Sequence, residues 1–285
     1  MKEMTVNLKL GGGTLYQPAN RNDTQMMSYI IDTGDGIVVI DGGTSCRDDS
    51  DAEFLYETLE KFGKKVKLWF ITHLHCDHYG ALMLLLEKGK FDIEVEKFCF
   101  NFMPYEWIIN CQGDVEVNKR FLEIFEKQNF NVCEVQRGDV FECGCVKFKV
   151  LFSPDHEKNY LDINSTSIII KASFPKRDVL FLGDFNFRSE EEYMEKCDVD
   201  ALRCDVVQMS HHGQGGCSRA FYELINPEVC LWTAPKWLYE NNNFFSDDPA
   251  TAGKGPFLTL ETRAWMKEMG VQENYAHAEG DYIFI

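Results

Sequence analysis

The feature that most constrains this chain is a run of metal-binding side chains directly after an apolar segment. Residues 66–72 have the composition of a buried strand, and the six residues that follow contain His73, His75, Asp77 and His78. Successive side chains of an extended segment alternate, so His73 and His75 point to the same side and can share one metal. Asp77 and His78 are expected in the following turn, where they can face a second metal. Imidazole and carboxylate ligands predict one or two Zn²⁺, with Mn²⁺ or Fe as alternatives.

Strand-like and helix-like segments alternate along the whole chain. Two sheets packed face to face, with helices outside, would bury this pattern. We therefore expect an α/β fold in a single domain over residues 1–285, with a long loop or lid at 235–257. The expected strands are 26–32, 36–41, 66–72, 132–135, 140–143, 146–152, 165–174, 178–182, 206–210, 229–233 and 282–285, and the expected helices are 51–62, 81–87, 118–128, 190–196, 219–225 and 260–269.

The composition limits the cellular compartment and the kinds of binding partner that we expect. The net charge of -17 disfavours binding of long nucleic acids, which are polyanions. The 11 cysteines are odd in number and form no CxxC pair, which disfavours both a disulfide framework and a zinc ribbon. The first residues contain no long apolar run, and no stretch has the length of a membrane span. We expect a cytoplasmic protein with no membrane attachment, and the sequence makes no prediction of its oligomeric state.

Two later segments offer further ligands. An apolar strand ends in Gly183-Asp184, which presents one carboxylate at a strand end, although a plain turn would look similar. A second strand ends in His211-His212-Gly213, where either histidine could bind a metal. An ordinary turn closed by Gly213 is the alternative here.

These motifs together resemble those of the metallo-β-lactamase superfamily. The HxHxDH hallmark is complete at residues 73–78, and YIIDTGDGIVVIDGG at 29–43 is similar to the first two strands of that family. The resemblance implies a four-layer αββα sandwich of two mixed sheets. It also implies that Asp184 bridges two metals, that His211 completes the second one, and that His212 is the alternative ligand or contacts substrate and leaving group. Asp41 would orient the site from behind the ligands. The expected metal ligands are thus His73, His75, Asp77, His78, Asp184 and His211, and the expected catalytic residues are Asp77, Asp41 and His212.

The third motif of the family departs from its usual pattern. No histidine stands four residues before Ser167, where the family has one; His156 is eleven residues away and Asn164 is three. The Asn-x-x-Ser spacing resembles a narrower subgroup that includes the hydrolase domains of bacterial DNA-uptake (competence) channels. Asn164 and His156 are therefore the candidates to replace the missing ligand. Without either, the first metal would keep only His73, His75 and Asp184.

The expected activity is that of a metal-dependent hydrolase using a metal-bound hydroxide. The subgroup's motifs favour a phosphodiester or a related small ester, so the expected partner is a small-molecule substrate carrying a phosphoryl group. A lactone or lactam hydrolase would use the same chemistry on a carbonyl carbon. A non-catalytic metal-binding protein is the remaining alternative, motivated by the incomplete first site.

Overall fold

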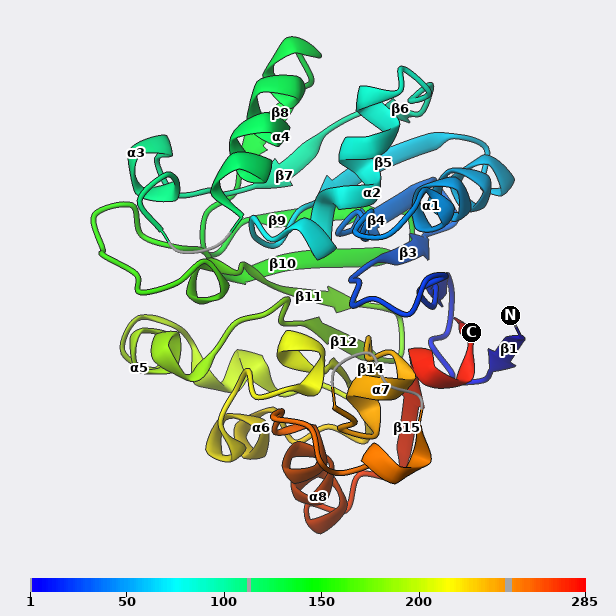
Figure 1. The fold of residues 1–285 in the computed structure, drawn as a ribbon, viewed down its shortest axis with the longest axis vertical. Helices are drawn as coiled ribbons and strands as arrows, with labels where there is room; N and C mark the ends of the chain where they lie inside the picture. Colours follow the sequence, from blue (N-terminus) through cyan, green and yellow to red (C-terminus); the bar gives the residue numbers. More distant parts are fainter. Residues whose placement is uncertain (1, 112–113, 244–247) are drawn as a thin grey trace.

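Two β-sheets form the centre of the molecule (Figure 1). The computed structural model describes residues 2–111, 114–243 and 248–285. Within them, one sheet has nine strands in the order β1-β16-β2-β3-β4-β5-β7-β8, with β6 paired to β5. The other has seven strands in the order β15-β14-β13-β12-β11-β10-β9. Both sheets mix parallel and antiparallel pairs.

The first sheet consists of β1 (Glu3–Val6), β2 (Thr14–Gln17), β3 (Tyr29–Asp32), β4 (Ile37–Ile40), β5 (Lys65–Phe70), β6 (Glu94–Val95), β7 (Phe98–Phe100), β8 (Val132–Glu134) and β16 (Asp281–Phe284). The second consists of β9 (Val140–Cys143), β10 (Val146–Phe152), β11 (Ile169–Ser173), β12 (Asp178–Phe181), β13 (Val206–Gln208), β14 (Val229–Trp232) and β15 (Glu273–Ala276). The helices are α1 (Ser50–Lys61), α2 (Cys76–Glu87), α3 (Tyr105–Ile108), α4 (Val115–Lys127), α5 (Phe187–Lys196), α6 (Arg219–Ile225), α7 (Lys236–Tyr239) and α8 (Thr259–Glu268).

The side chains of the central strands are apolar on both faces, which produces four layers. In β4, Val38 and Ile40 belong to the core between the sheets, whereas Ile37 and Val39 belong to the core beneath the helices. Strand β12 alternates in the same way. A strand buried on both faces must be covered by a sheet on one side and helices on the other. Figure 1 shows α1, α2 and α4 over the first sheet and α5, α6 and α8 over the second. The αββα sandwich predicted from the sequence is confirmed.

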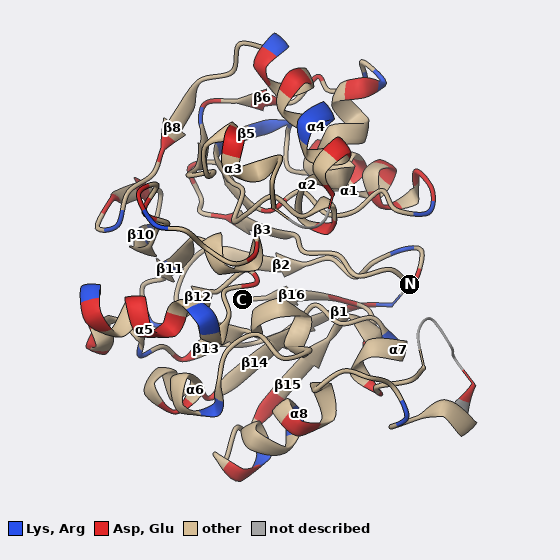
Figure 2. Cartoon of the chain, turned by 60° about the vertical axis from the view of Figure 1, so that its left-hand side comes forward, with Lys and Arg blue, Asp and Glu red and all other residues tan. Residues whose placement is uncertain are grey.

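The helices cover the sheets with apolar faces and turn their charges outward. In α4, Phe121 and Phe125 are buried, and the Phe121 ring stacks on Tyr79 of α2 with centroids 4.2 Å apart. Figure 2, a cartoon coloured by residue type, shows that the charged residues belong mainly to the outer helices and the loops, while the strands are mostly uncharged. No helix among the described residues is long and apolar enough to cross a membrane.

Several elements differ from the sequence prediction. Strand β1 was not expected; it pairs in parallel with β16, which places the two chain ends side by side (Figure 1). Helix α2 begins at Cys76, so Asp77 and His78 lie in its first turn and not in a turn before it. The segment 235–257 contains α7 and a short 3-10 helix at Pro249–Thr251, and its residues 244–247 lie outside the described residues. The loop or lid at 235–257 and the single domain both stay predictions.

Parallel strands bring the predicted site residues to one edge of the sandwich. Strands β4 and β5 run parallel, and so do β12, β13 and β14. Asp41 follows β4 and His73 comes soon after β5, while Asp184 follows β12 and the His211-His212 pair follows β13. Because the carboxyl ends of parallel strands lie at the same edge, residues far apart in the chain meet there.

Candidate metal centre

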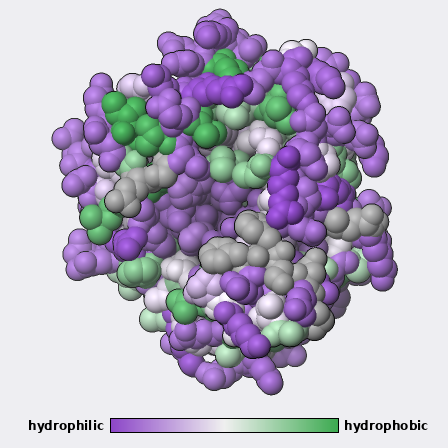
Figure 3. All heavy atoms as spheres, viewed as in Figure 1, coloured by the Kyte–Doolittle hydropathy of each residue, from purple (hydrophilic) through white to green (hydrophobic). Residues whose placement is uncertain are grey.

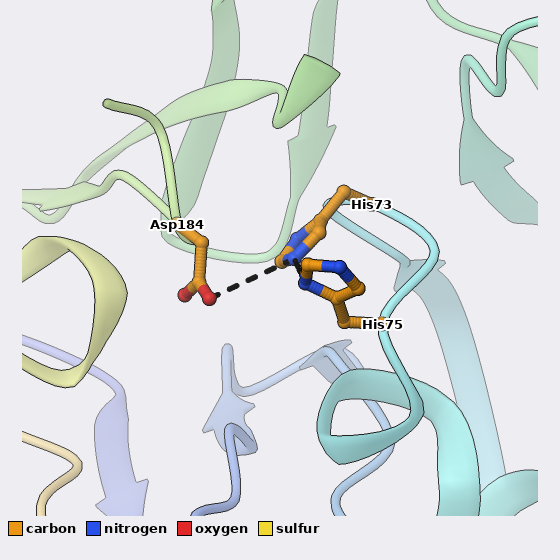
Figure 4. A group of neighbouring side chains, drawn as sticks. All are labelled: His73, His75 and Asp184. Atoms are coloured by element: carbon orange, nitrogen blue, oxygen red, sulfur yellow. Dashed lines mark hydrogen bonds and ion pairs between the residues drawn. The ribbon is translucent and has the colours of Figure 1, made fainter. Parts of the chain in front are cut away.

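The first group of ligand atoms comes from both sheets. Figure 4 shows His73 and His75, from the segment after β5, pointing toward Asp184 from the segment after β12. The Nε2 atom of His73 lies 3.2 Å from Nδ1 of His75 and 3.7 Å from Oδ2 of Asp184. One ligand atom from each of the three lies within 4.8 Å of the other two. The group therefore has the donor types and the spacing of a divalent-metal site.

The second group consists of Asp77, His78 and His212, with ligand atoms again within 4.8 Å of one another. The Nε2 atom of His212 lies 3.0 Å from Oδ2 of Asp77. His212 also donates a hydrogen bond from Nδ1 to the carbonyl oxygen of Thr233 at 2.9 Å. That bond fixes the ring so that Nε2 faces the site, which is how metal-binding imidazoles are commonly held.

Asp184 connects the two groups. Its Oδ2 atom faces His73, while its Oδ1 atom lies 3.2 Å from Nε2 of His78 and 3.9 Å from Nε2 of His212. Both Oδ1 of Asp184 and Nε2 of His78 are buried without a hydrogen-bond partner among the described residues. Buried polar atoms are normally paired, so two such atoms directed at one place fit the binding of a cation between them. The residues present thus fit two divalent metals that share Asp184.

Burial and charge set the protonation of these groups. Burial lowers the pKa of His73 well below its usual value. Burial also acts to lower the pKa of His78, but the carboxylates of Asp184, Asp41 and Asp77 together raise it well above its usual value. For Asp184, burial acts to raise the pKa, and the neighbouring histidines, above all His78, lower it well below its usual value. The site thus holds ionised carboxylates beside protonated imidazole, an arrangement that a metal would replace.

Asp41 holds the site from behind the ligands. The residue is fully buried and accepts hydrogen bonds from His78 Nδ1 at 2.7 Å, from the Thr72 amide at 2.7 Å and from the Thr72 hydroxyl at 2.9 Å. Its φ of 61° lies in the left-handed region, which directs its carboxylate toward β5. Asp41 therefore positions His78, and it contacts no ligand atom that faces the metals.

Replacement of Asp41 by asparagine is expected to weaken metal binding without changing the number of ligands. The amide can accept on one atom only, so the bond from His78 to Oδ2 and the bond from the Thr72 amide to Oδ1 cannot both be kept. Loss of such a partner typically costs about 10- to 100-fold in metal affinity. Competition with a chromogenic chelator would measure it, with Asp35→Asn at the exposed β3–β4 turn as the control. An affinity equal to that of the wild type would contradict the positioning role.

Asp184 is also held from behind, by residues to which the sequence analysis gave no role. The side-chain oxygen of Gln208 accepts hydrogen bonds from the backbone amides of Leu182 and Gly183, each at 2.8 Å. The hydroxyl of Ser167 accepts a hydrogen bond from the Asp184 amide at 3.2 Å. These contacts fix the turn after β12. The only sign in the sequence that Gln208 fixes this turn was its position in a buried strand. A glutamine there could equally be an ordinary core residue.

The two neighbouring histidines after β13 separate at a left-handed turn. His211 and His212 have φ angles of 50° and 54°, and Gly213 follows with a φ of 82°. This backbone sends His212 into the second group and leaves His211 nearer the first, with its Nε2 3.8 Å from Oδ2 of Asp184. His211 was the favoured ligand of the second metal, with His212 as the alternative; in the structure it is His212 whose ligand atom lies with those of Asp77 and His78. The apolar run that predicts strand β13 stops before these two histidines, so the sequence gives no information on their φ angles.

Replacement of Gly213 by alanine is expected to destabilise the fold by about 2 to 5 kcal/mol. The left-handed backbone contributes about 1 to 2 kcal/mol for any residue with a side chain. Overpacking adds about 1 to 3 kcal/mol, because the new methyl carbon would lie 2.4 Å from the buried Trp232 ring. Gly270→Ala is a matched control, since Gly270 has the same φ of 82° but no neighbour within 4 Å. Urea unfolding of both variants would measure the difference, and equal costs would contradict the packing argument.

The two candidates for the missing third-motif ligand lie in different places. Asn164, at the start of a 3-10 helix, reaches His211, with its Nδ2 3.4 Å from Nε2 of that residue. His156 is exposed and lines a separate cavity of about 330 Å³ together with Asn101 and Arg137. The structure therefore brings Asn164 to the metal centre and does not bring His156 there.

Comparison with known proteins agrees with this geometry. Residues 21–215, more than half of the chain, match the family model described as Metallo-beta-lactamase superfamily. The chain is 26% identical over 207 residues to the hydroxyacylglutathione hydrolase GloC of Haemophilus influenzae, a match covering 66% of this chain and 85% of that protein.

Solved structures share the fold at low sequence identity. The metallo-beta-lactamase fold protein YhfI from Bacillus subtilis superposes with a TM-score of 0.54 at 10% identity, over 95% of this chain and 99% of that one. CmlA, a diiron β-hydroxylase from Streptomyces venezuelae, gives a TM-score of 0.54 at 11% identity, over 95% of this chain and 54% of that one. With the family model spanning the HxHxDH run, Asp184 and both histidines after β13, this chain belongs to the metallo-beta-lactamase superfamily.

Proposed function

We propose that this metal-dependent hydrolase cleaves a small phosphodiester or a related small ester. The observation that carries the proposal is the position of Asp184, which directs one oxygen toward each of two ligand groups. Two divalent metals held in this way would lower the pKa of a water between them and polarise the group under attack.

The charge of the site favours an anionic substrate. Two divalent cations bring four positive charges, and the two carboxylates directed at them, Asp77 and Asp184, offset two. The remaining positive charge would attract the single negative charge of a phosphodiester and stabilise the additional charge that develops during attack. The Asn164 to Ser167 spacing, which resembles the subgroup containing the hydrolase domains of DNA-uptake channels, supports the same substrate class.

Access to the centre supports a small substrate. His73, His78 and His212 have fully buried side chains, whereas His211 and Asp77 retain 29% and 20% of their side-chain exposure. Part of the centre, including His211 and Asp77, is thus open to solvent while most of the histidine ligands are covered. Figure 3 shows a hydrophilic hollow in the middle of the face seen in Figure 1. The charge of -17 further disfavours a long nucleic acid, so a small phosphorylated molecule fits better.

A thioester of a small thiol is the second candidate, favoured by the relative whose name is hydroxyacylglutathione hydrolase. The same pair of metals serves attack on a carbonyl carbon as well as on phosphorus. A lactone or lactam would be cleaved by the same chemistry.

The test is hydrolysis by protein loaded separately with Zn²⁺, Mn²⁺ or Fe²⁺. The substrates are bis(p-nitrophenyl) phosphate, a hydroxyacylglutathione, a lactone and a chromogenic lactam. We expect metal-dependent release of nitrophenolate that a chelator abolishes. Turnover of the hydroxyacylglutathione alone would replace the phosphodiester by the second candidate, and no turnover of any ester at full metal loading would refute both.

A further inference from the structure

We propose that His211 and Asn164 form a pair of hydrogen-bond donors that binds an oxygen atom of the substrate beside the first metal position. The inference rests on the proposed function and adds to it two residues that contact substrate. It assigns His211 a role other than that of a metal ligand.

The position of His211 separates it from both ligand groups. Ligand atoms on one divalent metal lie at most roughly 4.2 Å apart, because each metal–ligand bond is about 2.1 Å long. Each group of the centre has its ligand atoms within 4.8 Å of one another, and His211 belongs to neither group. Its Nε2 nevertheless lies 3.8 Å from Oδ2 of Asp184, the oxygen that faces His73. His211 is thus within ligand spacing of Asp184 but does not belong to the group that Asp184 forms with His73 and His75, so it borders the first metal position from outside that group.

The exposure of His211 places it on the side from which a substrate arrives. Its side chain keeps 29% of its exposure, while the side chains of His73 and His212 keep none. A ring that is open to solvent on one side and next to the metal position on the other can contact a bound substrate.

Asn164 supplies the second donor. Its Nδ2 lies 3.4 Å from Nε2 of His211, and its Oδ1 is buried without a hydrogen-bond partner in the described part of the chain. Two nitrogen atoms 3.4 Å apart can both lie about 2.9 Å from one oxygen, the usual distance of such a hydrogen bond. In this structure Nδ2 of Asn164 donates a hydrogen bond to Nε2 of His211, so this nitrogen accepts. An imidazole can carry its proton on either nitrogen, so binding of a substrate oxygen in place of this bond would let Nε2 donate as well. Donors held in place before the substrate binds are the arrangement that stabilises developing charge on oxygen.

Two substitutions at one position provide the test. Glutamine places an N–H near the position of Nε2 of histidine, and asparagine is too short to do so. In protein loaded with zinc and freed of excess metal, we expect His211→Asn to weaken binding of inorganic phosphate about 10- to 100-fold, the effect of losing a hydrogen bond to a charged group. His211→Gln should stay within about threefold of the wild type. Asn164→Ala should resemble His211→Asn, and His156→Ala, an exposed histidine outside the centre, is the control.

Metal content distinguishes this role from ligation. Every variant is expected to keep the metal content and metal affinity of the wild type, measured by elemental analysis and chelator competition. Loss of one metal in His211→Asn would overturn the proposal in favour of a ligand role. Tighter metal binding in the Asn164→Asp variant would likewise favour a ligand role for Asn164, because a carboxylate is a stronger metal ligand than an amide.

Calorimetry with phosphate separates this inference from the proposed function. The donor pair would be refuted if the His211→Asn variant binds phosphate as tightly as the wild type, or if the wild type does not bind phosphate. Either result would count even if the protein hydrolyses esters. Phosphate binding that depends on both residues, in a protein that hydrolyses no ester, would leave the pair standing and refute the proposed function.

Discussion

Replacement of Asp184 by asparagine is expected to remove hydrolysis almost completely, by roughly 10³-fold or more, because this one carboxylate would hold both metals. The amide cannot offer two anionic oxygens, one toward His73 and one toward His78. The metal content should fall from two per chain to one or none. Elemental analysis after dialysis would measure it, together with the rate on whichever ester the wild type cleaves.

The matched control is Asp178→Asn, at the opposite end of the same strand β12. Asp178 forms an ion pair with Lys171 and lies away from the centre, so its replacement should leave both metal content and rate unchanged. Thermal unfolding of both variants would show whether the fold is kept. An Asp184→Asn protein that binds two metals as tightly as the wild type would refute the bridging role.

The parts of the centre that lie close together in the sequence were predicted well. His73, His75, Asp77 and His78 span six residues, so the sequence alone keeps their side chains close together, although Asp77 and His78 lie in the first turn of α2 and not in the turn that was expected. Asp184 stood out in the sequence only as a carboxylate at a strand end, and its role was implied by the resemblance to the family. The structure explains its position, because parallel strands bring their carboxyl ends to one edge. The four layers were implied by the resemblance to the family, and the structure shows their physical basis in strands that are apolar on both faces, as in β4 and β12.

Features that depend on backbone angles or on distant partners were not predicted. The choice between His211 and His212 is made by two left-handed φ angles, which no periodicity reports. Strand β1 is short, lies at the edge of its sheet and is paired with the far end of the chain, so its own four residues carry little signal. The roles of Thr72 and Gln208 arise from hydrogen bonds across sheet neighbours, and only coordinates show which buried polar side chain meets which partner.

In the metal-free protein, the ring nitrogens of His78 and His212 that would bind the second metal carry protons instead. Burial acts to lower the pKa values of both His78 and His212, but the surrounding carboxylates, Asp184 foremost, raise both. The Nδ1 atoms of these rings already donate, to Asp41 and to the Thr233 carbonyl. The proton that a metal must displace is therefore the one on Nε2 of each ring, next to Asp184 and Asp77.

Metal binding at the second group is accordingly expected to rise steeply with pH. Below the raised pKa values each imidazole releases one proton on binding, so the affinity should increase up to about tenfold per pH unit for each ring, and about a hundredfold for both. The lowered pKa of His73 leaves that ring neutral, so it contributes no such dependence at the first group. Zinc titration calorimetry at pH 6, 7 and 8, in buffers of different ionisation enthalpy, would count the protons. At pH 6, below the usual histidine pKa, we expect two protons released with the second metal and one in a His212→Asn variant. Release of no proton would show that these rings are neutral before the metal arrives, and that the carboxylates around them do not hold the charge we assign to them.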